Sequence, residues 1–376
     1  MRDMSTRAGE WAVALALAIA SAQAAEPTAT FQAIGSLSES TAQVSIAATP
    51  DGRVVIGEAW LADVFDAQSN AWLPPISYHA SHWTAGAALL PDGRVLVAGT
   101  ASTSATITAE ILDPVAGTSA VTGALLAPRY GSALNAMLDG RVLAWAGTAP
   151  GSSGSLVATT EVFNPATGSF SSSGSNPPAR WNATFTRLAD GRFLIAGGST
   201  ADGTVQQVAQ VYDPVSNQTT NVGALPDFVW QHAAVLLQDG RVLIVGGQYS
   251  YQGSVRPSNH AFVYSPNTGQ FTPLPLMVYA RKLPTATLLP DGKVLIPGGG
   301  GDFWSLADRA EIFDPATNTF ALGPSMVVPR YGASAAALPD GRVLIAGGWD
   351  RDDSNGQPVS VVEVYGSDRI FEGTFE

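Results

Sequence analysis

Apolar and polar positions along the chain repeat in one pattern. A short apolar run, an Asp-Gly pair followed by Arg or Lys, and a second aliphatic run recur seven times, and the copy at 338–348 (LPDGRVLIAGG) is typical. The aspartates of the seven pairs are Asp51, Asp92, Asp139, Asp190, Asp239, Asp291 and Asp340. Because the apolar runs have strand length and Asp-Gly tolerates the positive φ of a tight turn, each copy predicts a β-hairpin.

A second element lies between the hairpins. It alternates polar and apolar residues and ends in an Asx-Pro turn, as at 161–165 (EVFNP) and 311–315 (EIFDP). The alternation predicts a half-buried strand, and a further strand follows the turn. Each repeat therefore has four strands, named a to d in chain order: a and b flank the Asp-Gly turn, c carries the alternating pattern, and d follows the Asx-Pro turn.

The spacing between these elements is constant in one part of the repeat and variable in another. One reference position lies ten residues before each Asp-Gly pair. From the end of the preceding strand c to this position, the distance is 16 residues in every repeat. By contrast, the interval from each Asp-Gly aspartate to the end of the following strand c ranges from 15 to 26 residues. Length variation is therefore confined to the b–c connections, and in repeat proteins such insertions often mark the binding face.

The two ends of the chain predict a closed ring. The last strand c ends near Gly366 without a strand d after it, whereas the segment 31–37 (FQAIGSL) matches the strand d at 320–326 (FALGPSM) in register. We expect residues 28–37 to form the outermost strand of the last repeat, which leaves no open sheet edge in the ring. The domain then covers residues 25–366, and residues 367–376 form a C-terminal tail.

Four-stranded repeats of this length resemble the kelch motif of β-propellers, including the galactose-oxidase-like central domain. The resemblance rests on the Glu-Val-Tyr-Asp-Pro type of strand and on Gly-Gly doublets, which stand at Gly197-Gly198, Gly246-Gly247, Gly298-Gly299 and Gly347-Gly348. It implies an all-β fold, a seven-bladed β-propeller of four-stranded antiparallel blades. The first three repeats depart from it, with Gly57-Glu58, Gly99-Thr100 and Gly147-Thr148 in place of the doublet. Propellers support many functions, so the resemblance is informative about fold and not about chemistry.

The first 24 residues have the form of a secretory signal peptide. Arg2 and Arg7 precede an apolar run at 11–20, and Ala22-Gln23-Ala24 is a small-residue cleavage site. We expect a secreted or periplasmic protein that begins at Ala25. The C-terminal segment 369–376 resembles the short Ile-Phe-x-x-x-Phe-Glu endings of some exported bacterial proteins. No later stretch is long and apolar enough to be a transmembrane helix.

Composition narrows the range of partners. The chain has a formal net charge of −12, which argues against nucleic acid or an anionic membrane as a partner. It has no cysteine, so an exported form must be stabilised by a packed core and not by disulfides. We expect a monomer that binds a glycan, a peptide or a protein.

Two sets of residues are candidates for the mouth of the ring, where the d–a and b–c connections emerge. The first set, ten residues before each Asp-Gly pair, is Thr41, His82, Arg129, Arg180, Val229, Arg281 and Arg330. The second set, one residue later, is Ala42, Trp83, Tyr130, Trp181, Trp230, Lys282 and Tyr331. Successive strand residues point to opposite sides, so only one set faces the mouth while the other packs between blades.

These sets allow two interpretations. In the first, His82 and the four arginines form a ring suited to carboxylate or sulfate, beside aromatic platforms suited to sugar faces or a peptide. In the second, the arginines are solvated at blade edges or brace neighbouring loops, and the aromatic residues fill the core between blades. The longest b–c connections, at 248–260, 299–308 and 349–357, add further candidates. These are Tyr249, Tyr251, Arg256, Asp302, Trp304, Trp349 and Asp350, of which we expect Trp304 and Trp349 to contribute most.

Metal and cofactor sites are not expected. On an extended strand His79 and His82 would face opposite sides, so they predict no metal site. The segment 350–356 resembles a calcium loop but lacks the Gly at its sixth position and the Glu at its twelfth, which favours a solvated acidic turn. The resemblance to galactose oxidase implies a copper-radical cofactor that needs a tyrosine crosslinked to cysteine, and this chain has no cysteine.

Two functional hypotheses remain from the sequence. The first is an exported, non-catalytic propeller that binds its ligand on the d–a/b–c face. The second is a carbohydrate-active enzyme of the same superfamily, such as an epimerase, a lyase or a non-copper relative, with acid–base groups such as Asp302 and Asp308, or His82 or His232. A carboxylate or histidine in a deep axial pocket near the arginines would favour the enzyme. The absence of a recognisable catalytic motif favours binding.

Overall fold

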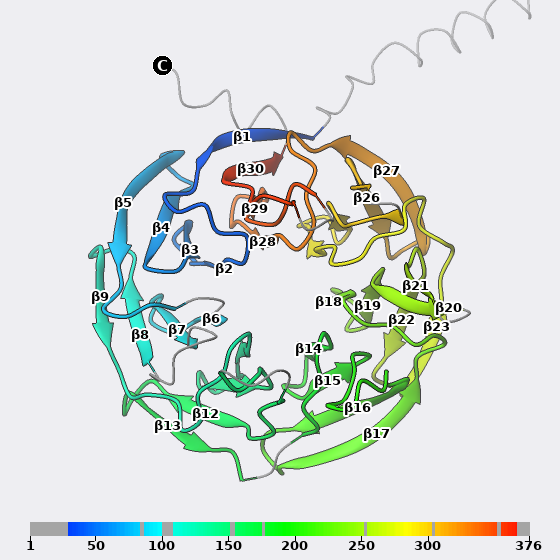
Figure 1. Cartoon of the computed structure of the whole chain (residues 1–376), viewed down its shortest axis with the longest axis horizontal. Helices are drawn as coiled ribbons and strands as arrows, with labels where there is room; N and C mark the ends of the chain where they lie inside the picture. Colours follow the sequence, from blue (N-terminus) through cyan, green and yellow to red (C-terminus); the bar gives the residue numbers. More distant parts are fainter. Residues whose placement is uncertain are drawn as a thin grey trace, which may run out of the picture.

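The computed structural model describes residues 29–82, 86–99, 108–150, 155–174, 177–251, 254–302, 305–351 and 355–366. In these ranges the chain forms seven four-stranded antiparallel sheets, arranged as blades around a ring, and one two-stranded hairpin (Figure 1). The predicted all-β, seven-bladed propeller is therefore confirmed. The predicted signal peptide, the whole predicted tail (367–376), Trp83 and Trp304 lie outside the described residues.

The first four blades follow the chain from the innermost strand a to the outermost strand d. Blade 1 is β2 (Ser45–Ala48), β3 (Arg53–Gly57), β4 (Leu61–Asp66) and β5 (Ala71–Ser77). Blade 2 is β6 (Gly86–Leu89), β7 (Val95–Gly99), β8 (Thr108–Asp113) and β9 (Thr118–Val121). Blade 3 is β10 (Ala133–Ala136), β11 (Val142–Trp145), β12 (Glu161–Asn164) and β13 (Ser169–Ser172). Blade 4 is β14 (Thr184–Arg187), β15 (Phe193–Ala196), β16 (Val208–Asp213) and β17 (Gln218–Ala224).

The last three blades include the added hairpin and the closing strand. Blade 5 is β18 (Ala233–Leu236), β19 (Val242–Val245), β22 (Ala261–Ser265) and β23 (Gln270–Pro273), with the hairpin β20 (Gln248–Tyr251) and β21 (Ser254–Pro257) in its b–c connection. Blade 6 is β24 (Thr287–Leu288), β25 (Val294–Ile296), β26 (Arg309–Asp314) and β27 (Thr319–Ser325). Blade 7 is β28 (Ser334–Ala337), β29 (Val343–Ala346), β30 (Val361–Gly366) and β1 (Thr30–Ser36).

The hydrophobic core lies in the seams between neighbouring blades. Between blades 3 and 4, the ring of Phe185 stacks on Trp145 at 4.7 Å and on Phe193 at 4.6 Å. All four residues of strand b in blade 7, β29, are buried. Each blade therefore buries both faces of its inner strands against its neighbours, and stability depends on an unbroken ring.

The N-terminal strand closes this ring as predicted. β1 pairs antiparallel with β30, with Phe31 opposite Tyr365 and Ser36 opposite Val361. The indole N–H of Trp72, on β5 of blade 1, donates a hydrogen bond of 2.8 Å to the carbonyl of Ile34. A Cβ at Gly35 would lie only 2.3 Å from that indole nitrogen, so glycine is required for this contact. The closing strand is thereby bound to both of the blades that meet at the seam.

The Gly-Gly doublets join each blade to the next. In blade 7, the backbone N–H of Gly348 donates to the carbonyl of Ala42 in blade 1 at 2.7 Å, and a Cβ at Gly347 would lie 2.7 Å from that oxygen. The same bond runs from Gly198 to Val229, from Gly247 to Arg281 and from Gly299 to Arg330. The positions seven and eight residues after the Asp-Gly aspartate are thus the doublet positions. In repeat 3 they hold Ala146 and Gly147, with Ala146 at φ 55°, and in repeat 1 they hold Glu58 and Ala59, which corrects the alignment expected from sequence by one residue.

Candidate functional site

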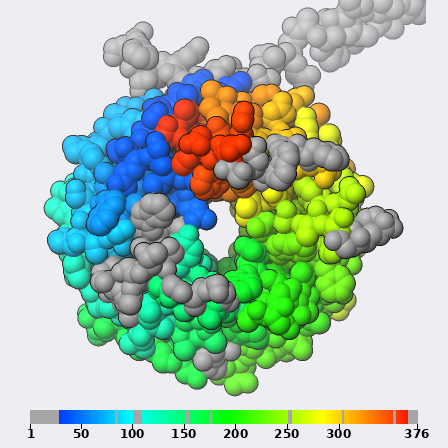
Figure 2. Space-filling model, in the orientation of Figure 1, coloured from blue at the N-terminus to red at the C-terminus, as the bar shows by residue number. Residues whose placement is uncertain are grey.

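The mouth of the ring is formed by the d–a and b–c connections, which pair with each other at the entrance. Tyr130 and Thr148 exchange two backbone hydrogen bonds of 2.9 Å, and the same bridge joins Trp181 to Ser199 and Tyr331 to Trp349. The space-filling view shows an opening at the centre of the ring (Figure 2). Residues of the two candidate sets therefore lie where a ligand could reach them, or directly beneath that surface.

The arginines of the first set are held inside the blades. Arg330 is 0% exposed, and its guanidinium donates to the carbonyls of Gly347 (3.1 Å) and Val361 (2.7 Å) and to the carboxylate of Glu363. Glu363 also accepts the backbone N–H groups of Val327 (2.8 Å) and Val328 (2.9 Å). We call this arrangement the crossover clasp, because it fastens the d–a crossover to strand c.

The clasp recurs with changes around the ring. Arg129 meets Glu161 and Arg281 meets Glu311, whereas Arg180 meets the neutral side chain of Gln210. Burial lowers the pKa of Arg180 to about 10, so that it remains charged at neutral pH. These arginines have no surface left for a ligand, and the interpretation in which they brace neighbouring loops describes them. We therefore withdraw Arg129, Arg180, Arg281 and Arg330 as ligand-binding residues.

In blade 2 the clasp contains histidine. The ring nitrogen Nε2 of His82 lies 3.0 Å from Glu110, and Nδ1 of His79 lies 3.0 Å from the other oxygen of the same carboxylate. Burial alone would raise the pKa of Glu110, but hydrogen bonds from Ser119, His79 and His82 outweigh it and lower the pKa to about 2. The prediction that His79 and His82 face opposite sides is wrong, because they flank a bend and not an extended strand. His82 is buried and is likewise withdrawn as a ligand-binding residue.

Two blades lack the cation altogether. In blade 5 the clasp positions hold Val229 and Phe262, which join the apolar core of that seam. In blade 1 they hold Thr41 and Asp63, and the side chain of Glu58 is buried beside them at 2% exposure. Burial and the hydrogen bond to Asp63 raise the pKa of Glu58 to about 8. Within the described part of the chain, the blade 1 clasp is therefore an acid pair without a positively charged partner.

The large residues of the second set lie at the surface of the mouth, whereas Ala42 is buried. Tyr130, Trp181, Trp230 and Tyr331 are all partly exposed, and each precedes a residue with positive φ. These following residues bond to one another from blade to blade: Gln231 N–H donates to Asn182 (3.0 Å), Leu283 to Gln231 (2.9 Å) and Gly332 to Leu283 (3.0 Å). The rim of blades 4 to 7 is thus a continuous backbone chain that holds the large side chains in fixed positions.

Side-chain contacts at the mouth also extend between blades. The hydroxyl of Tyr130 in blade 3 donates to Oε1 of Gln43 in blade 1 at 3.3 Å, past the intervening blade 2. The ammonium of Lys282 lies 5.6 Å from the centre of the Tyr331 ring, a cation–π distance. In the long connection of blade 5, Tyr249 stacks on His260 at 5.6 Å. Aromatic faces and small polar groups therefore dominate the described part of the mouth.

A small pocket opens between blades 7 and 1 on this face. Its volume is about 120 Å³, and its lining residues are Ser40, Thr41, Ala42, Gln43, Ala59, Trp349 and Pro358. We call it the seam pocket. In this pocket Trp349, predicted from the long connection of blade 7, meets the d–a crossover of blade 1.

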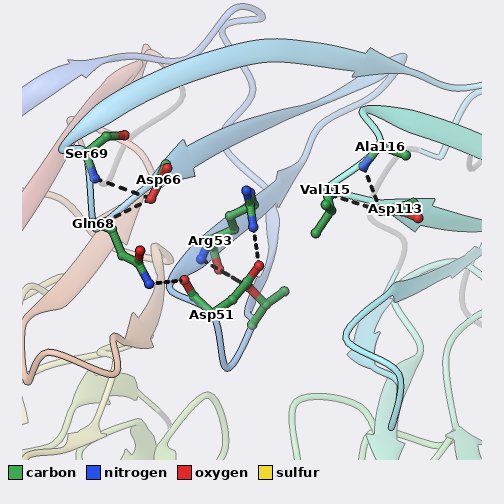
Figure 3. A network of polar contacts seen from close by, with 9 residues as sticks. Asp51, Arg53, Asp66, Gln68, Ser69, Asp113, Val115 and Ala116 are labelled. Atoms are coloured by element: carbon green, nitrogen blue, oxygen red, sulfur yellow. Dashed lines mark hydrogen bonds and ion pairs between the residues drawn. The ribbon is translucent and has the colours of Figure 1, made fainter.

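A larger groove lies between blades 1 and 2, among the Asp-Gly and Asx-Pro turns of the opposite face. It has a volume of about 560 Å³, and Asp51, Asp92, Arg94 and Asp113 line it. Its charged groups are occupied locally, as Figure 3 shows: Arg53 pairs with Asp51, and Asp113 accepts the N–H groups of Val115 and Ala116 (2.9 Å each).

The seam beside this groove lacks a contact that the seam between blades 7 and 1 has. Between blades 7 and 1, Arg342 crosses the seam to Asn70 (2.9 Å) and to the carbonyl of Ala67 (2.6 Å). Blade 2 has Gly117 at the position of Asn70, so Arg53 has no side-chain acceptor across the seam. The charged groups beside this groove are paired locally, so we do not take it as the binding site.

Metal chemistry of the galactose-oxidase type does not fit these residues. The chain has no cysteine for the crosslinked cofactor. In the described part of the chain, no group of three or more His, Asp or Glu side chains is placed to hold a metal ion. His79 and His82, the nearest pair, are both directed at Glu110. The calcium-loop segment 350–356 lies partly outside the described residues, and in the rest of it Asp350 accepts the N–H of Gln357 (2.7 Å).

Comparison with known proteins agrees with this architecture. The kelch motif matches residues 231–277, which lie in blade 5. A solved structure described as a novel fungal alcohol oxidase with catalytic diversity among the AA5 family, in complex with copper, is similar with a TM-score of 0.71 and 18% identity, over 87% of this chain and 74% of that one. The structure of YjhT is similar with a TM-score of 0.60 and 13% identity, over 76% of this chain and 98% of that one. No curated protein matches the chain.

Identities this low establish shared fold and nothing about activity. Within the described ranges there is also no helix long and apolar enough to cross a membrane. The seven four-stranded blades, the kelch motif in blade 5 and these two neighbours lead to one conclusion: the chain folds as a seven-bladed β-propeller that carries a kelch motif in blade 5 and is similar in fold to these two solved structures.

Proposed function

We propose that this propeller is an exported binding module that holds a glycan, peptide or protein ligand against the aromatic residues of its mouth. The observation that carries the proposal is the difference in solvent exposure between the two candidate sets. The guanidinium groups of the arginines are hydrogen-bonded inside the buried clasps. By contrast, the rim that is held by backbone hydrogen bonds carries four partly exposed aromatic residues: Tyr130, Trp181, Trp230 and Tyr331. Exposed aromatic side chains in fixed positions are typical of binding surfaces.

The same observation indicates what kind of ligand fits. A guanidinium ring would have favoured carboxylate or sulfate, but those groups are internal. At the second-set positions of the described blades, Lys282 is the one charged side chain, and it packs over Tyr331. We therefore expect a ligand that offers flat apolar faces and neutral polar groups, and we expect its affinity to depend weakly on salt.

The enzyme alternative has less support from the described residues. His82 and His232 are buried, with His82 on Glu110 and His232 on Thr184 (3.0 Å). The carboxylates near the arginines are the buried clasp partners Glu161, Glu311 and Glu363. None of these groups can reach a bound substrate, and Asp302 and Asp308 are exposed residues of one long connection.

Export belongs to the proposal and rests on the N-terminal sequence. A signal peptide would place the mouth outside the cytoplasm, where glycans and peptide segments of other proteins are accessible. The absence of cysteine is compatible with an oxidising environment, because no thiol can mispair.

The test is a binding screen with matched variants. The purified protein is applied to a glycan array and to a peptide library, and the best ligand is measured by calorimetry against Trp181→Ala and Trp230→Ala. We expect each substitution to weaken binding by about tenfold or more, because truncation of an aromatic anchor costs about 2 kcal/mol. Leu138→Ala is the control, since Leu138 is exposed at the Asp-Gly turn of blade 3 on the opposite face. Equal effects from all three substitutions would reject the mouth as the site.

A further inference from the structure

One second-set position in the described blades holds a small side chain instead of a large one. At the second-set positions the described blades carry Tyr130, Trp181, Trp230, Lys282 and Tyr331, which are all large. Blade 1 carries Ala42 instead. The seam pocket, with a volume of about 120 Å³, opens beside Ala42. The pocket therefore lies beside the one second-set position of the described blades that holds a small side chain.

The walls of the pocket are mainly apolar and are held in place by the backbone. Ala42 and Ala59 supply small side chains from blade 1, and Trp349 and Pro358 supply flat ones from blade 7. Trp349 exchanges backbone hydrogen bonds with Tyr331 (3.0 and 3.2 Å) and forms a bridge with Pro358. The indole wall thus belongs to a fixed b–c connection, while blades 3 to 6 have Thr148, Ser199, Gln248 and Gly300 in its place.

Three polar side chains stand at the edge of the pocket: Ser40, Thr41 and Gln43. Oε1 of Gln43 accepts the Tyr130 hydroxyl, and the amide NH₂ of Gln43 makes no hydrogen bond within the described part of the chain. The hydroxyl of Thr41 is turned to the buried Glu58 at 3.0 Å. Among the residues that the structure describes, no charged side chain lines the pocket. The exposed side chains of Ser40 and Gln43 can each offer a hydrogen bond at the edge of this mainly apolar space, which suits a ligand group with few polar atoms.

We propose that the seam pocket receives one aromatic side chain from a peptide segment of a protein partner, which completes the aromatic rim. This rests on the proposed function and specifies its ligand class. A cavity of roughly 150 Å³ with apolar walls accommodates a benzene-sized ring, so the pocket is of the right scale for a phenyl or phenol group. A ring inserted there can stack on Trp349 or meet its edge, and aromatic anchors in such pockets are frequent binding hot spots.

The same pocket is less suitable for a sugar ring. A pyranose buries several hydroxyl groups, and a hydroxyl that loses water without gaining a partner costs about 1 to 3 kcal/mol. Most of the wall here is Ala, Pro and indole carbon, which offers no such partners. A peptide aromatic residue buries only carbon, or carbon and one hydroxyl, and this asymmetry favours a peptide over a glycan.

The experiment uses small probes on the intact protein. N-acetyl-L-tyrosinamide and N-acetyl-L-phenylalaninamide are titrated by NMR or calorimetry, with methyl β-D-glucopyranoside as the sugar probe. We expect the aromatic amides to bind with dissociation constants of about 1 to 10 mM, as one buried ring allows, and the sugar to bind at least tenfold more weakly. Ala42→Trp, which copies the residue of blades 4 and 5, should fill the pocket and weaken the amides at least tenfold while the melting temperature is maintained.

Two further variants keep the test decisive. Trp349→Ala removes the indole wall and should weaken the amides by a similar factor even if Ala42→Trp fails to fold. Trp60→Ala is the matched control, because Trp60 holds the position of Trp349 in blade 1, is 59% exposed and does not line the pocket. It should leave the affinity unchanged.

The failure of this proposal is distinguishable from failure of the proposed function. No binding of the amides by the wild type at 20 mM, a sugar bound as well as the amides, or amides bound equally by Ala42→Trp would each overturn the pocket assignment. Loss of the array ligand in Trp181→Ala and Trp230→Ala would still support binding at the mouth. The opposite result is also possible to recognise. If Ala42→Trp abolishes binding of the aromatic amides while no mouth variant changes the affinity for the array ligand, the pocket assignment is supported and the wider proposal of binding at the mouth is rejected.

Discussion

Replacing Glu58 by Gln should make the protein less sensitive to pH and more stable at pH 8. Six of the seven clasps have an arginine, a histidine or an apolar pair, but blade 1 places Glu58 (2% exposed) next to Asp63 (4% exposed). Glu58 accepts the hydroxyl of Thr41 (3.0 Å) and the N–H of Glu39 (3.2 Å), and Asp63 accepts the N–H and hydroxyl of Ser38 (2.7 and 2.6 Å). The pair therefore fastens the segment that leads from the closing strand into blade 1.

The sign and size of the effect follow from the pKa of Glu58. Burial and the hydrogen bond to Asp63 raise this pKa from 4.5 to about 8. Between those values the folded protein keeps a proton that the unfolded chain has lost, so the free energy of unfolding falls as pH rises and levels off above pH 8. Each pKa unit corresponds to about 1.4 kcal/mol, and the loss over this window is on the order of 3 to 5 kcal/mol. A glutamine at 58 can donate an N–H to Asp63 at every pH and has no proton to lose.

The assay is urea unfolding of both proteins from pH 5 to pH 9. Burial lowers the pKa of His82, and it lowers the pKa of His232 to about 4. Both histidines make stability rise with pH below about 6.5. Because they are the same in both proteins, their effect cancels in the difference between variant and wild type. We expect that difference to shift in favour of Glu58→Gln by about 3 kcal/mol or more between pH 5 and pH 8.

A contrasting variant tests the reasoning at another blade. Glu363→Gln removes a carboxylate that meets the guanidinium of Arg330, so it should destabilise the protein at every pH in this range, by about 3 kcal/mol. A difference between Glu58→Gln and wild type that stays constant within 0.5 kcal/mol from pH 5 to pH 8 would refute the assignment of a retained proton to Glu58.

The remaining predictions concern closure, the glycine doublets and export. Removing residues up to Leu37 deletes the closing strand β1 and should abolish soluble expression, because β30 and the blade 1 seam lose their partner; a protein starting at Ser38 that melts like the full one would contradict this. Gly348→Ala should cost about 2 to 4 kcal/mol in chemical unfolding, because a Cβ there lies 2.8 Å from the Tyr331 carbonyl oxygen, whereas Gly93→Ala, with similar φ and nothing within 4 Å, should cost only about 1 kcal/mol. N-terminal sequencing of exported protein should begin at Ala25, and a reductant should leave the melting temperature unchanged, since the chain has no cysteine.

Much of the fold could be predicted because its determinants are local and repeated. An Asp-Gly turn between two apolar runs defines a hairpin within about ten residues, and seven copies in phase define the number of blades. Even the closing strand, which pairs residues more than 300 positions apart, was predictable, since the segment 31–37 repeats the pattern of a strand d. Its register against β30 follows from the alternation of side chains, because a shift by one residue would turn Phe31 away from the core.

The candidate site was less predictable because strand periodicity defines two alternate faces without stating which one meets solvent. The sequence is equally compatible with two roles for the first-set arginines: binding a ligand, or bracing neighbouring loops. Their burial depends on carboxylates 30 to 33 residues away on strand c, such as Glu161 and Glu363, and on carbonyl groups of the doublet positions. His79 and His82 were misplaced for a related reason, because a bend that lets both reach Glu110 is stabilised by that contact and not by local sequence.

The sequence by itself determined the strands, the number of blades, the seam at which the ring closes and the exclusion of a cysteine-dependent cofactor. These properties depend on turn chemistry, side-chain alternation and composition, which act over short stretches of chain. Only the tertiary structure decided that the aromatic set lies at the mouth, that Glu58 is buried against Asp63, and that Ala42 leaves a pocket beside Trp349. Each of these depends on residues from different blades or strands meeting across a seam, where packing and desolvation are set by neighbours that are distant in the chain.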